Sequence, residues 1–406
     1  MKEEELFAAA LDLKSPWYIA KIELREAQEN KKELHLYIDH EKGVLFDYEG
    51  ESCPVYDHMD RTWRHLNFFE HECYLHARVP RVKLKDKSIR QVKVPWALPG
   101  SSFTLLFEDF AMSLVKLGLS NSACGRLLNI DGRRVGKIIR YRVSMALAVQ
   151  ELGQVKHLSI DEVSAGKGHK YLTILSDRKR KIVVGIGRGK DAKAVEEALL
   201  CKEVRGSYRE DVQSITMDMS RAFISAAADK MGQADIIFDR YHIVAKLNEA
   251  LDKIRKTEQQ EFKELKKSKY LFLKRAENLT SEQKDKVDYL SDAYPTLGKA
   301  YRLKEMFREV WNEAAQTQKL RPLNDWIRHV KDSGLKPMIN FVNMLYRHWY
   351  GIKTCFKYLA TNAFAERVNL SIQDIKRIAK GYRNEQNFIY MIYFHLGGLD
   401  LSLPIE

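Results

Sequence analysis

Two aspartates inside apolar segments are the residues of this sequence best placed to do chemistry. Asp161 follows Leu158 and Ile160 inside the segment VKHLSIDEVSAG, and Asp218 follows Ile215 and Met217 inside SITMDMS. Asp is a poor strand former, and burying a carboxylate is costly unless another charge compensates it. A bound divalent metal ion would provide that charge. For either acid alone, an ordinary position at the end of a strand is the simpler interpretation.

A pair of such acids indicates phosphoryl transfer. Two neighbouring carboxylates repel each other, and two metal ions about 3.5–4 Å apart would remove the repulsion and clamp the attacking and leaving oxygens of an in-line displacement. Carboxylates and phosphate oxygens are ligands that Mg²⁺ prefers, and Mn²⁺ can take its place. Glu366, in a helical segment near the C-terminus, is the candidate third ligand. The neighbouring Glu162 should face away from Asp161, because side chains alternate along a strand.

The segments around these acids predict a mixed sheet covered by helices. Three strand candidates follow one another within residues 155–188, and helices then alternate with strands at 214–220 and 234–242. Residues 257–350 contain no convincing strand and have a helical pattern. From Asn362 onward the sequence predicts a long helix that ends near Gly381 and carries Glu366.

Residues 101–149 predict three helices in a helix-turn-helix arrangement. Gly118 ends the first helix, Ser120 can cap the second, and the turn NIDG precedes the third. The third helix has an apolar inner face and a basic outer face, which suits insertion in the major groove of DNA. A basic face that is merely solvated is the alternative. The candidate DNA contacts here are Arg133, Arg134, Lys137 and Arg140.

Residues 1–100 predict a β-rich module. ELHLYIDH at 33–40 alternates apolar and polar residues, as a half-buried strand does. The following patch, RTWRHLNFFEHECYLHARVPRVKLK, interleaves basic and aromatic side chains. This mixture suits contact with phosphates plus stacking, and it suits a plain amphipathic sheet equally well. The candidate DNA contacts in the patch are Arg61, Arg64, Arg78 and Arg81.

Composition bounds the partners and the compartment. The net charge of +13 favours a polyanion, most commonly nucleic acid, although a basic protein without such a partner is the alternative. Five scattered cysteines argue against a disulfide framework. Apolar runs are too short to span a bilayer, and the acidic N-terminus does not match a secretory signal. We therefore expect a cytoplasmic protein that does not enter a membrane.

The sequence as a whole resembles the DDE transposases of bacterial insertion sequences, specifically the ISL3 family. The resemblance rests on the motifs SIDE, TMDMS, FDRYH and NAFAERVN in this order, together with the basic and aromatic patch above and KVPWALPG. The resemblance covers nearly the whole chain. It implies an RNase H-like core in which Asp161, Asp218 and Glu366 are the catalytic, metal-binding acids. The separation of 148 positions between Asp218 and Glu366 is explained by a helical insertion. Asp239 and His242 match the motif DRYH and receive a supporting role: His242 bonds to a catalytic carboxylate or lies near the scissile phosphate. A histidine satisfied in the core is the alternative.

The N-terminal region departs from the family in its cysteines. The family carries a zinc module with two Cys-x-x-Cys pairs, whereas this chain reads Cys53-Pro-Val-Tyr56 and Leu84-Lys-Asp-Lys87 at the matching places. Structural zinc sites need four ligands. A substitute set of Cys53, His58, Cys73 and His76 can be drawn, but we expect the module to fold around its aromatic residues without zinc.

The predicted fold class is therefore α/β: an RNase H-like mixed sheet with a helical insertion, preceded by a small β-rich module and a helix-turn-helix. The predicted function is cleavage and joining of double-stranded DNA at terminal inverted repeats and a target, with Mg²⁺ or Mn²⁺, by a homodimer that synapses two ends. A catalytically inactive DNA-binding derivative and an RNase H-like nuclease are the alternatives. The predicted segments are a β-rich module at 1–100, the helix-turn-helix at 101–149, core at 150–256, helical insertion at 257–355 and the last part of the core at 356–406.

Overall fold

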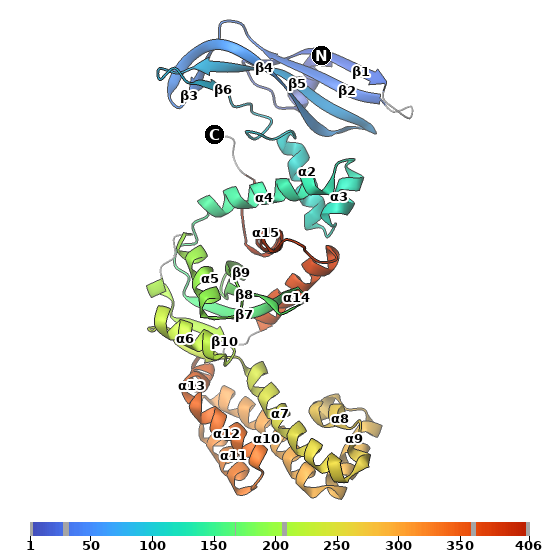
Figure 1. The fold of residues 1–406 in the computed structure, drawn as a ribbon, viewed down its shortest axis with the longest axis vertical. Coiled ribbons are helices and arrows are strands. Elements are labelled where there is room, and N and C mark those ends of the chain that lie inside the picture. Colours follow the sequence, from blue (N-terminus) through green and yellow to red (C-terminus); the bar gives the residue numbers. More distant parts are fainter. Residues whose placement is uncertain (1–2, 27–31, 167, 205–208, 359–362, 403–406) are drawn as a thin grey trace. The chain divides into compact units, whose positions relative to one another are not determined.

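The computed structural model describes residues 3–26, 32–166, 168–204, 209–358 and 363–402. The chain divides into two compact units (Figure 1). The first comprises Met1–Ala146 with Asp400–Glu406, and the second comprises Leu147–Leu399. Among the described residues, no helix is long and apolar enough to cross a membrane.

The first unit begins with helix α1 (Glu3–Ala10) and a six-stranded mixed sheet in the order β1-β2-β5-β4-β3, with β6 paired to β5. Strands β2 and β5 run parallel, and the other pairs run antiparallel. Alternating apolar side chains build one buried face, on which the Trp96 ring meets Trp17 and Trp63 edge to face. The strands are β1 Trp17–Glu26, β2 Lys32–His40, β3 Leu45–Tyr48, β4 Glu51–Phe68, β5 His71–Lys83 and β6 Ile89–Gln91.

Three helices complete the first unit: α2 (Leu105–Lys116), α3 (Asn121–Leu127) and α4 (Gly132–Val149). The side chains of Thr104 and Ser120 cap α2 and α3 by accepting a backbone N–H. The second and third helices approach so closely that a Cβ on Gly125 would lie 2.6 Å from the Ile130 carbonyl oxygen. This contact holds α3 and α4 at a fixed angle across a short turn.

A buried arginine ties α4 to α2. Arg142 is 1% exposed, and its Nε donates to Glu108 Oε2 at 3.1 Å. A second nitrogen of the same guanidinium donates to Asp109, and a third lies 3.3 Å from the carbonyl oxygen of Leu401. Burial raises the pKa of Glu108, and the Arg142 charge acts against that rise. The arrangement makes Arg142 the centre of an ion-pair cluster inside the first unit.

The second unit is built on a five-stranded mixed sheet in the order β11-β10-β7-β8-β9. Strands β7, β8 and β9 form an antiparallel meander, whereas β10 and β11 run parallel to β7. Helix α5 (Ala192–Val204) lies directly on β9, where a Cβ on Gly187 would come within 1.8 Å of the Ala194 carbonyl oxygen. The strands are β7 His157–Gly166, β8 Lys170–Asp177, β9 Ile182–Arg188, β10 Ser214–Met217 and β11 Asp235–Phe238, and helix α6 spans Arg221–Lys230.

Helices alone make up the described part of the chain from 257 to 355. The long helix α7 (Arg240–Glu261) leads out of the sheet, and α10 (Pro295–Thr317) lies along it (Figure 1). The aromatic core of this helical region includes Phe307, Trp326 and Phe341, whose ring centroids lie 4.8–6.1 Å apart. The other helices are α8 Lys269–Leu273, α9 Ser281–Ala293, α11 Arg321–Asp332, α12 Lys336–Arg347 and α13 Trp349–Tyr358; α14 Ala363–Ile378 and α15 Glu385–Leu396 follow.

Candidate active site

Asp161 lies within β7 and is held by two amide donors. Its Oδ1 accepts the Glu162 backbone N–H at 2.8 Å, and its Oδ2 accepts Nδ2 of Asn369 at 2.7 Å. Burial raises the pKa of Asp161, while these two hydrogen bonds and the nearby His242 lower it, and Asp239 raises it further. A half-buried carboxylate with this surrounding is well placed to bind a cation.

Strand register aligns three aspartates across the sheet. Residues of β10 pair with β7 as Ser214 with His157, and continuing that register beyond the last paired residue sets Asp218 beside Asp161. The register of β10 and β11, continued by one residue from Met217, sets Asp239 beside Asp218. Neighbouring strands are about 4.8 Å apart. The continued register therefore places three carboxylates in a row across the sheet, with Asp161 inside β7 and with Asp218 and Asp239 directly after β10 and β11.

Asp239 is the N-cap of α7, and Asp218 lies two residues before Ser220, the N-cap of α6. The Asp218 Oδ1 accepts the Ser220 N–H at 2.9 Å just before α6, and Asp239 accepts the Tyr241 N–H at 2.9 Å as the N-cap of α7. The predicted strand at 234–242 is thus too long. β11 ends at Phe238 because Asp239 is a capping residue whose side chain satisfies a free amide of the first helical turn.

His242 therefore lies in the first turn of α7. Its Nε2 is 3.7 Å from Asp239 Oδ2, and its charge acts on Asp161. The structure brings His242 close to both carboxylates, in agreement with the position that its predicted supporting role requires. The role itself stays a prediction.

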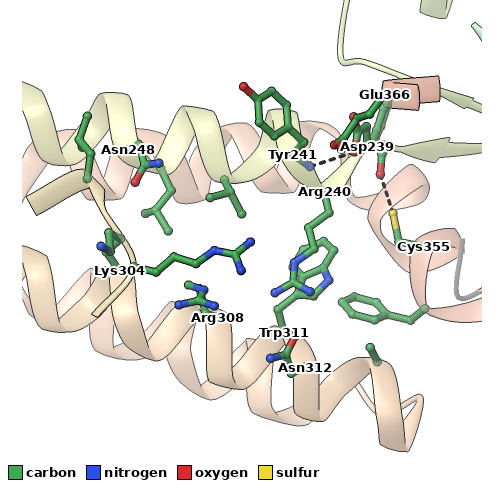
Figure 2. A pocket seen from close by; sticks show the side chains of 17 residues that line it. Asp239, Arg240, Tyr241, Asn248, Lys304, Arg308, Trp311, Asn312, Cys355 and Glu366 are labelled. Carbon is green, nitrogen blue, oxygen red and sulfur yellow. Dashed lines mark hydrogen bonds between the residues drawn. The ribbon is translucent and has the colours of Figure 1, made fainter. Parts of the chain in front are cut away.

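Glu366 lies in the first turn of α14, which packs against β7. The Lys376 ammonium of α14 donates to the Ser164 carbonyl oxygen at 3.0 Å, and Asn369 reaches Asp161. Glu366 is exposed and shares the lining of one cavity with Asp239 (Figure 2). The predicted start of this helix at Asn362 lies outside the described residues.

Asn369 is the neighbour of the acids that sequence reasoning missed. It stands three residues after Glu366, a spacing that puts two side chains on the same face of a helix. Its Oδ1 is buried and has no hydrogen-bond partner among the described residues. The helical spacing within NAFAERVN could have indicated this neighbour, but an asparagine alone carries no signal for a metal site.

The donor set suits a hard divalent cation. Carboxylate oxygens and the unpartnered amide oxygen of Asn369 are the ligand type of Mg²⁺ or Mn²⁺. Within the described ranges, however, no three His, Cys, Asp or Glu side chains are grouped closely enough to hold a metal ion. The acids are right in kind and adjacent by strand register, but the structure does not gather Asp161, Asp218 and Glu366 into one ligand shell.

The arginines of the β-rich sheet differ in their freedom to meet DNA. Arg64 is buried, lies 3.4 Å from the Glu72 carboxylate and donates to the Cys73 carbonyl oxygen, so it serves the sheet and is not available to a phosphate. Arg81 is bonded to Asp57. Arg61 lies over the Trp63 ring, and the exposed Arg78 is 3.9 Å from Asp39. Of these four, Arg78 keeps its guanidinium open, whereas Arg61 is half-buried and also donates to the Ser101 carbonyl oxygen.

The four candidate DNA contacts on α4 are all exposed, unlike the buried Arg142 of the same helix. The Arg133 side chain is 92% exposed and forms an ion pair with Asp131 at 2.6 Å. Arg134 lies over the Phe103 ring, 4.2 Å from its centroid, and donates to Ser102 Oγ. Lys137 and Arg140 continue the same face toward the C-terminal end of the helix.

Comparison with known proteins identifies the class. A family model of DDE transposases, described as "Transposase", matches residues 158–392, more than half of the chain. That stretch holds the five-stranded sheet, the row of aspartates and α14. The chain belongs to the ISL3 family of DDE transposases, which confirms the resemblance predicted from its motifs and implies an RNase H-like core.

Individual relatives agree over almost the full length. The transposase for insertion sequence element IS1001 of Bordetella parapertussis is 24% identical over 365 residues, covering 86% of this chain and 88% of that protein. The transposase for insertion sequence element IS1557 of Mycobacterium tuberculosis (strain CDC 1551 / Oshkosh) is 25% identical over 373 residues, covering 85% of this chain and 83% of that protein. The chain is thus a transposase of an insertion sequence.

The prediction that the N-terminal module does without zinc is wrong. A model described as the zinc-finger of transposase IS204/IS1001/IS1096/IS1165 matches residues 50–86. The prediction counted thiolates in Cys-x-x-Cys pairs, whereas imidazole nitrogens are also common zinc ligands. The sheet brings His40 and His58 to 2.9 Å between their Nε2 atoms, and His35 Nδ1 and His76 Nε2 to 2.8 Å.

The substitute ligand set proposed from sequence is not assembled. Cys73 is buried, and burial raises the pKa of its thiol to about 12, which disfavours the thiolate that binds zinc. His58 and His76 pair with histidines of β2 instead of with the two cysteines. Among the described residues the module offers imidazole pairs and no group of three ligands.

Proposed function

We propose that this transposase binds the terminal inverted repeats of its element, cuts the DNA there and joins the 3′ ends to a target. The observation that supports the proposal is the parallel pairing of β10 with β7, since its register, continued past the end of β10, puts Asp218 beside Asp161, to which α14 is bonded. In this reading residues 150–256 and 356–406 form an RNase H-like core around the insertion at 257–355. The β-rich module at 1–100 and the helix-turn-helix at 101–149 bind DNA.

The proposed metal ligands are Asp161, Asp218 and Glu366. Divalent ions bound there would supply positive charge at the attacking and leaving oxygens of an in-line displacement at phosphorus. Asn369 would hold the Asp161 carboxylate in one orientation through its amide. His242, beside Asp161 and Asp239, is placed to take or give a proton at the reacting oxygen. Asp239 lies in the same row as Asp161 and Asp218 and is the alternative third metal ligand if Glu366 does not bind the metal.

The direct test is cleavage of a labelled duplex that carries the element's own terminal repeat. With Mg²⁺, we expect a nick at the repeat end that leaves a 3′-hydroxyl, followed by joining of that end to a second duplex. Binding without nicking would mean an inactive DNA-binding derivative. Loss of the labelled cleavage when excess unrelated duplex, RNA–DNA hybrid or branched DNA is added would mean a nuclease without end recognition. Two ends must be synapsed, so we further propose a homodimer in the complex with DNA.

Asn369→Ala is expected to lower the cleavage rate about 10- to 100-fold, the usual effect of removing a residue that orients a metal ligand. The Asn369 amide lowers the pKa of Asp161, so its loss raises that pKa. Because the ionised carboxylate is the active form, the acidic limb of the pH–rate profile should move to higher pH. Asn369→Asp would add a repelling charge and should also be slow. A uniform rate loss with an unmoved pH profile would indicate a structural role only.

Combined replacement of Arg133, Arg134 and Lys137 by Ala should weaken binding to the terminal repeat. Each lost phosphate contact reduces the slope of log K against log salt by about 0.9. If a side chain reads a base, one position of the repeat should also tolerate substitution. Anisotropy titrations at several salt concentrations measure both effects. Unchanged affinity would move the recognition surface to residues 61–83 of the β-rich sheet, where Arg78 and Lys83 are exposed.

A further inference from the structure

A cavity of about 620 Å³ lies between α7 and α10 and opens beside the candidate acids (Figure 2). Its volume is within the range of about 300–1,000 Å³ that accommodates small ligands. Asp239 and Glu366 stand at one end, and Asn248 stands two helical turns further along α7. The cavity therefore extends from the proposed site of chemistry into the helical insertion.

Basic side chains dominate the charge of this cavity. Arg240, Arg275, Lys304 and Arg308 line it. Lys304 is buried, and its ammonium donates to the carbonyl oxygens of Phe272 and Lys274. Arg275 and Arg308 both lie within 3.5 Å of Glu277. Three of the four cations thus have partners that fix them in place.

Arg240 is different, because no carboxylate pairs with it anywhere in the described part of the chain. Its guanidinium carbon lies 5.7 Å from the centroid of the Trp311 ring, and Figure 2 shows it reaching from the start of α7 toward Trp311 and Arg308. Burial lowers the pKa of Arg240, and the charges of Arg308 and Arg275 lower it further. A half-buried guanidinium held among like charges is a ready site for an anion.

The remaining lining suits the rest of a nucleotide. Trp311 and Phe356, whose rings are 4.8 Å apart, form an apolar wall with Val244 and Leu247. Asn248 and Asn312 add amides, and the Oδ1 of Asn248 is buried without a hydrogen-bond partner among the described residues. Cations along a groove, an aromatic wall and amide groups are the features by which proteins hold single-stranded nucleic acid.

We propose that this cavity binds an unpaired nucleotide of the DNA strand next to the scissile phosphate, with a phosphate at Arg240 and Arg308 and the sugar and base along Trp311 toward Asn248. The inference rests on the proposed function, since it needs DNA at the neighbouring acids. A duplex is too bulky to enter a cavity of this volume, whereas a nucleotide separated from its complement can. The insertion then holds the strand while the core cuts it.

The test measures binding of a short fluorescent deoxythymidine oligonucleotide to the full chain in a buffer without Mg²⁺ or Mn²⁺, where no cleavage occurs. Arg240→Ala should weaken binding about 10-fold or more, as loss of a charge-assisted hydrogen bond does, and should reduce the salt slope by about 0.7. Arg302→Ala is the matched control, because Arg302 is exposed on α10 and does not line the cavity. It should leave affinity within about twofold.

Two further readouts locate the strand. An oligonucleotide carrying iododeoxyuridine should cross-link to the peptide that contains Trp311 in the wild type and lose this cross-link in Arg240→Ala. The melting temperature of Arg240→Ala without DNA should change little, since the variant loses the contact with Trp311 but no ion pair. An oligonucleotide affinity equal to that of Arg302→Ala, or a cross-link mapped only outside the cavity, would overturn the proposal.

The source of the phosphate is tested separately. Inorganic phosphate and deoxythymidine monophosphate are titrated against wild type and Arg240→Ala, with melting temperature as the readout. If phosphate and the mononucleotide raise the melting temperature only weakly, while the oligonucleotide binds tightly and depends on Arg240, the ligand of the cavity is the DNA strand. Tight binding of the mononucleotide with Arg240-independent oligonucleotide binding would mean a free-nucleotide site and overturn the proposal. All these measurements are made without cleavage, so a failure of the proposed catalytic acids would leave their outcome intact.

Discussion

Asp161→Asn, Asp218→Asn and Glu366→Gln are each expected to reduce cleavage of the terminal-repeat duplex by about 1,000-fold, or roughly 4 kcal/mol of transition-state stabilisation. Each change keeps the shape of a proposed metal ligand and removes its charge. Folding should survive, because burial already raises the pKa of Asp161 and a neutral amide suits that position. Nicking assays with Mg²⁺ measure the rate, and anisotropy shows whether DNA binding is retained.

Glu162→Gln is the matched control for this series, since it removes a neighbouring charge from β7 whose side chain points the other way. It should retain most of the activity. Asp239→Asn tests whether Asp239 or Glu366 is the third metal ligand. If it abolishes cleavage while Glu366→Gln remains active, the acid next to Asp218 on the sheet is the third ligand and Glu366 belongs to the DNA cavity. Full activity in Asp161→Asn or Asp218→Asn would disprove the proposed site.

Arg142→Ala is expected to destabilise the first unit by about 3–5 kcal/mol, the usual result of removing one partner from a buried ion pair. The carboxylate of Glu108, whose side chain is 4% exposed, would lose its guanidinium, and α4 would lose its bonds to α2 and to Leu401. Denaturant unfolding monitored by tryptophan fluorescence measures the loss. Terminal-repeat binding should fall at the temperature where the first unit melts.

Arg140→Ala serves as the control for stability, because it removes the same charge from the exposed face of α4. The double variant Arg142→Leu with Glu108→Leu should recover much of the stability, since neither charge is then left buried alone. A midpoint of unfolding for Arg142→Ala that equals that of Arg140→Ala would mean that the ion-pair cluster contributes little.

The location of the sheet and its acids could be predicted because local patterns decide both. Asp161 and Asp218 interrupt apolar runs, and such an interruption is visible in sequence without any knowledge of neighbours. The alignment of Asp161, Asp218 and Asp239 across the sheet depends on which strands pair and in which register. Pairing is settled by tertiary packing, so the row of three could not be predicted from the separate segments.

The misjudged residues share one cause. Arg64 resembled a DNA contact because it lies in a basic patch, but its partner Glu72 and the carbonyl of Cys73 come from the adjacent strand β5. Asn369 resembled an ordinary helix residue because Asp161 lies 208 positions away. In the zinc module, counting cysteines overlooked histidines that β2 supplies to β4 and β5. Each error concerns a contact between segments distant in sequence.

The bonds that complete both units come from the end of the chain. Asp161 receives Asn369, and Arg142 receives the carbonyl of Leu401, 259 residues later. A ribosome releases the N-terminal part first, and domains fold as they emerge. The bond to Asp161 can form only after Asn369 has left the ribosome, and the bond to Arg142 only after Leu401 has. We therefore expect the surroundings of Asp161 to be completed long after the strand that carries it has been synthesised.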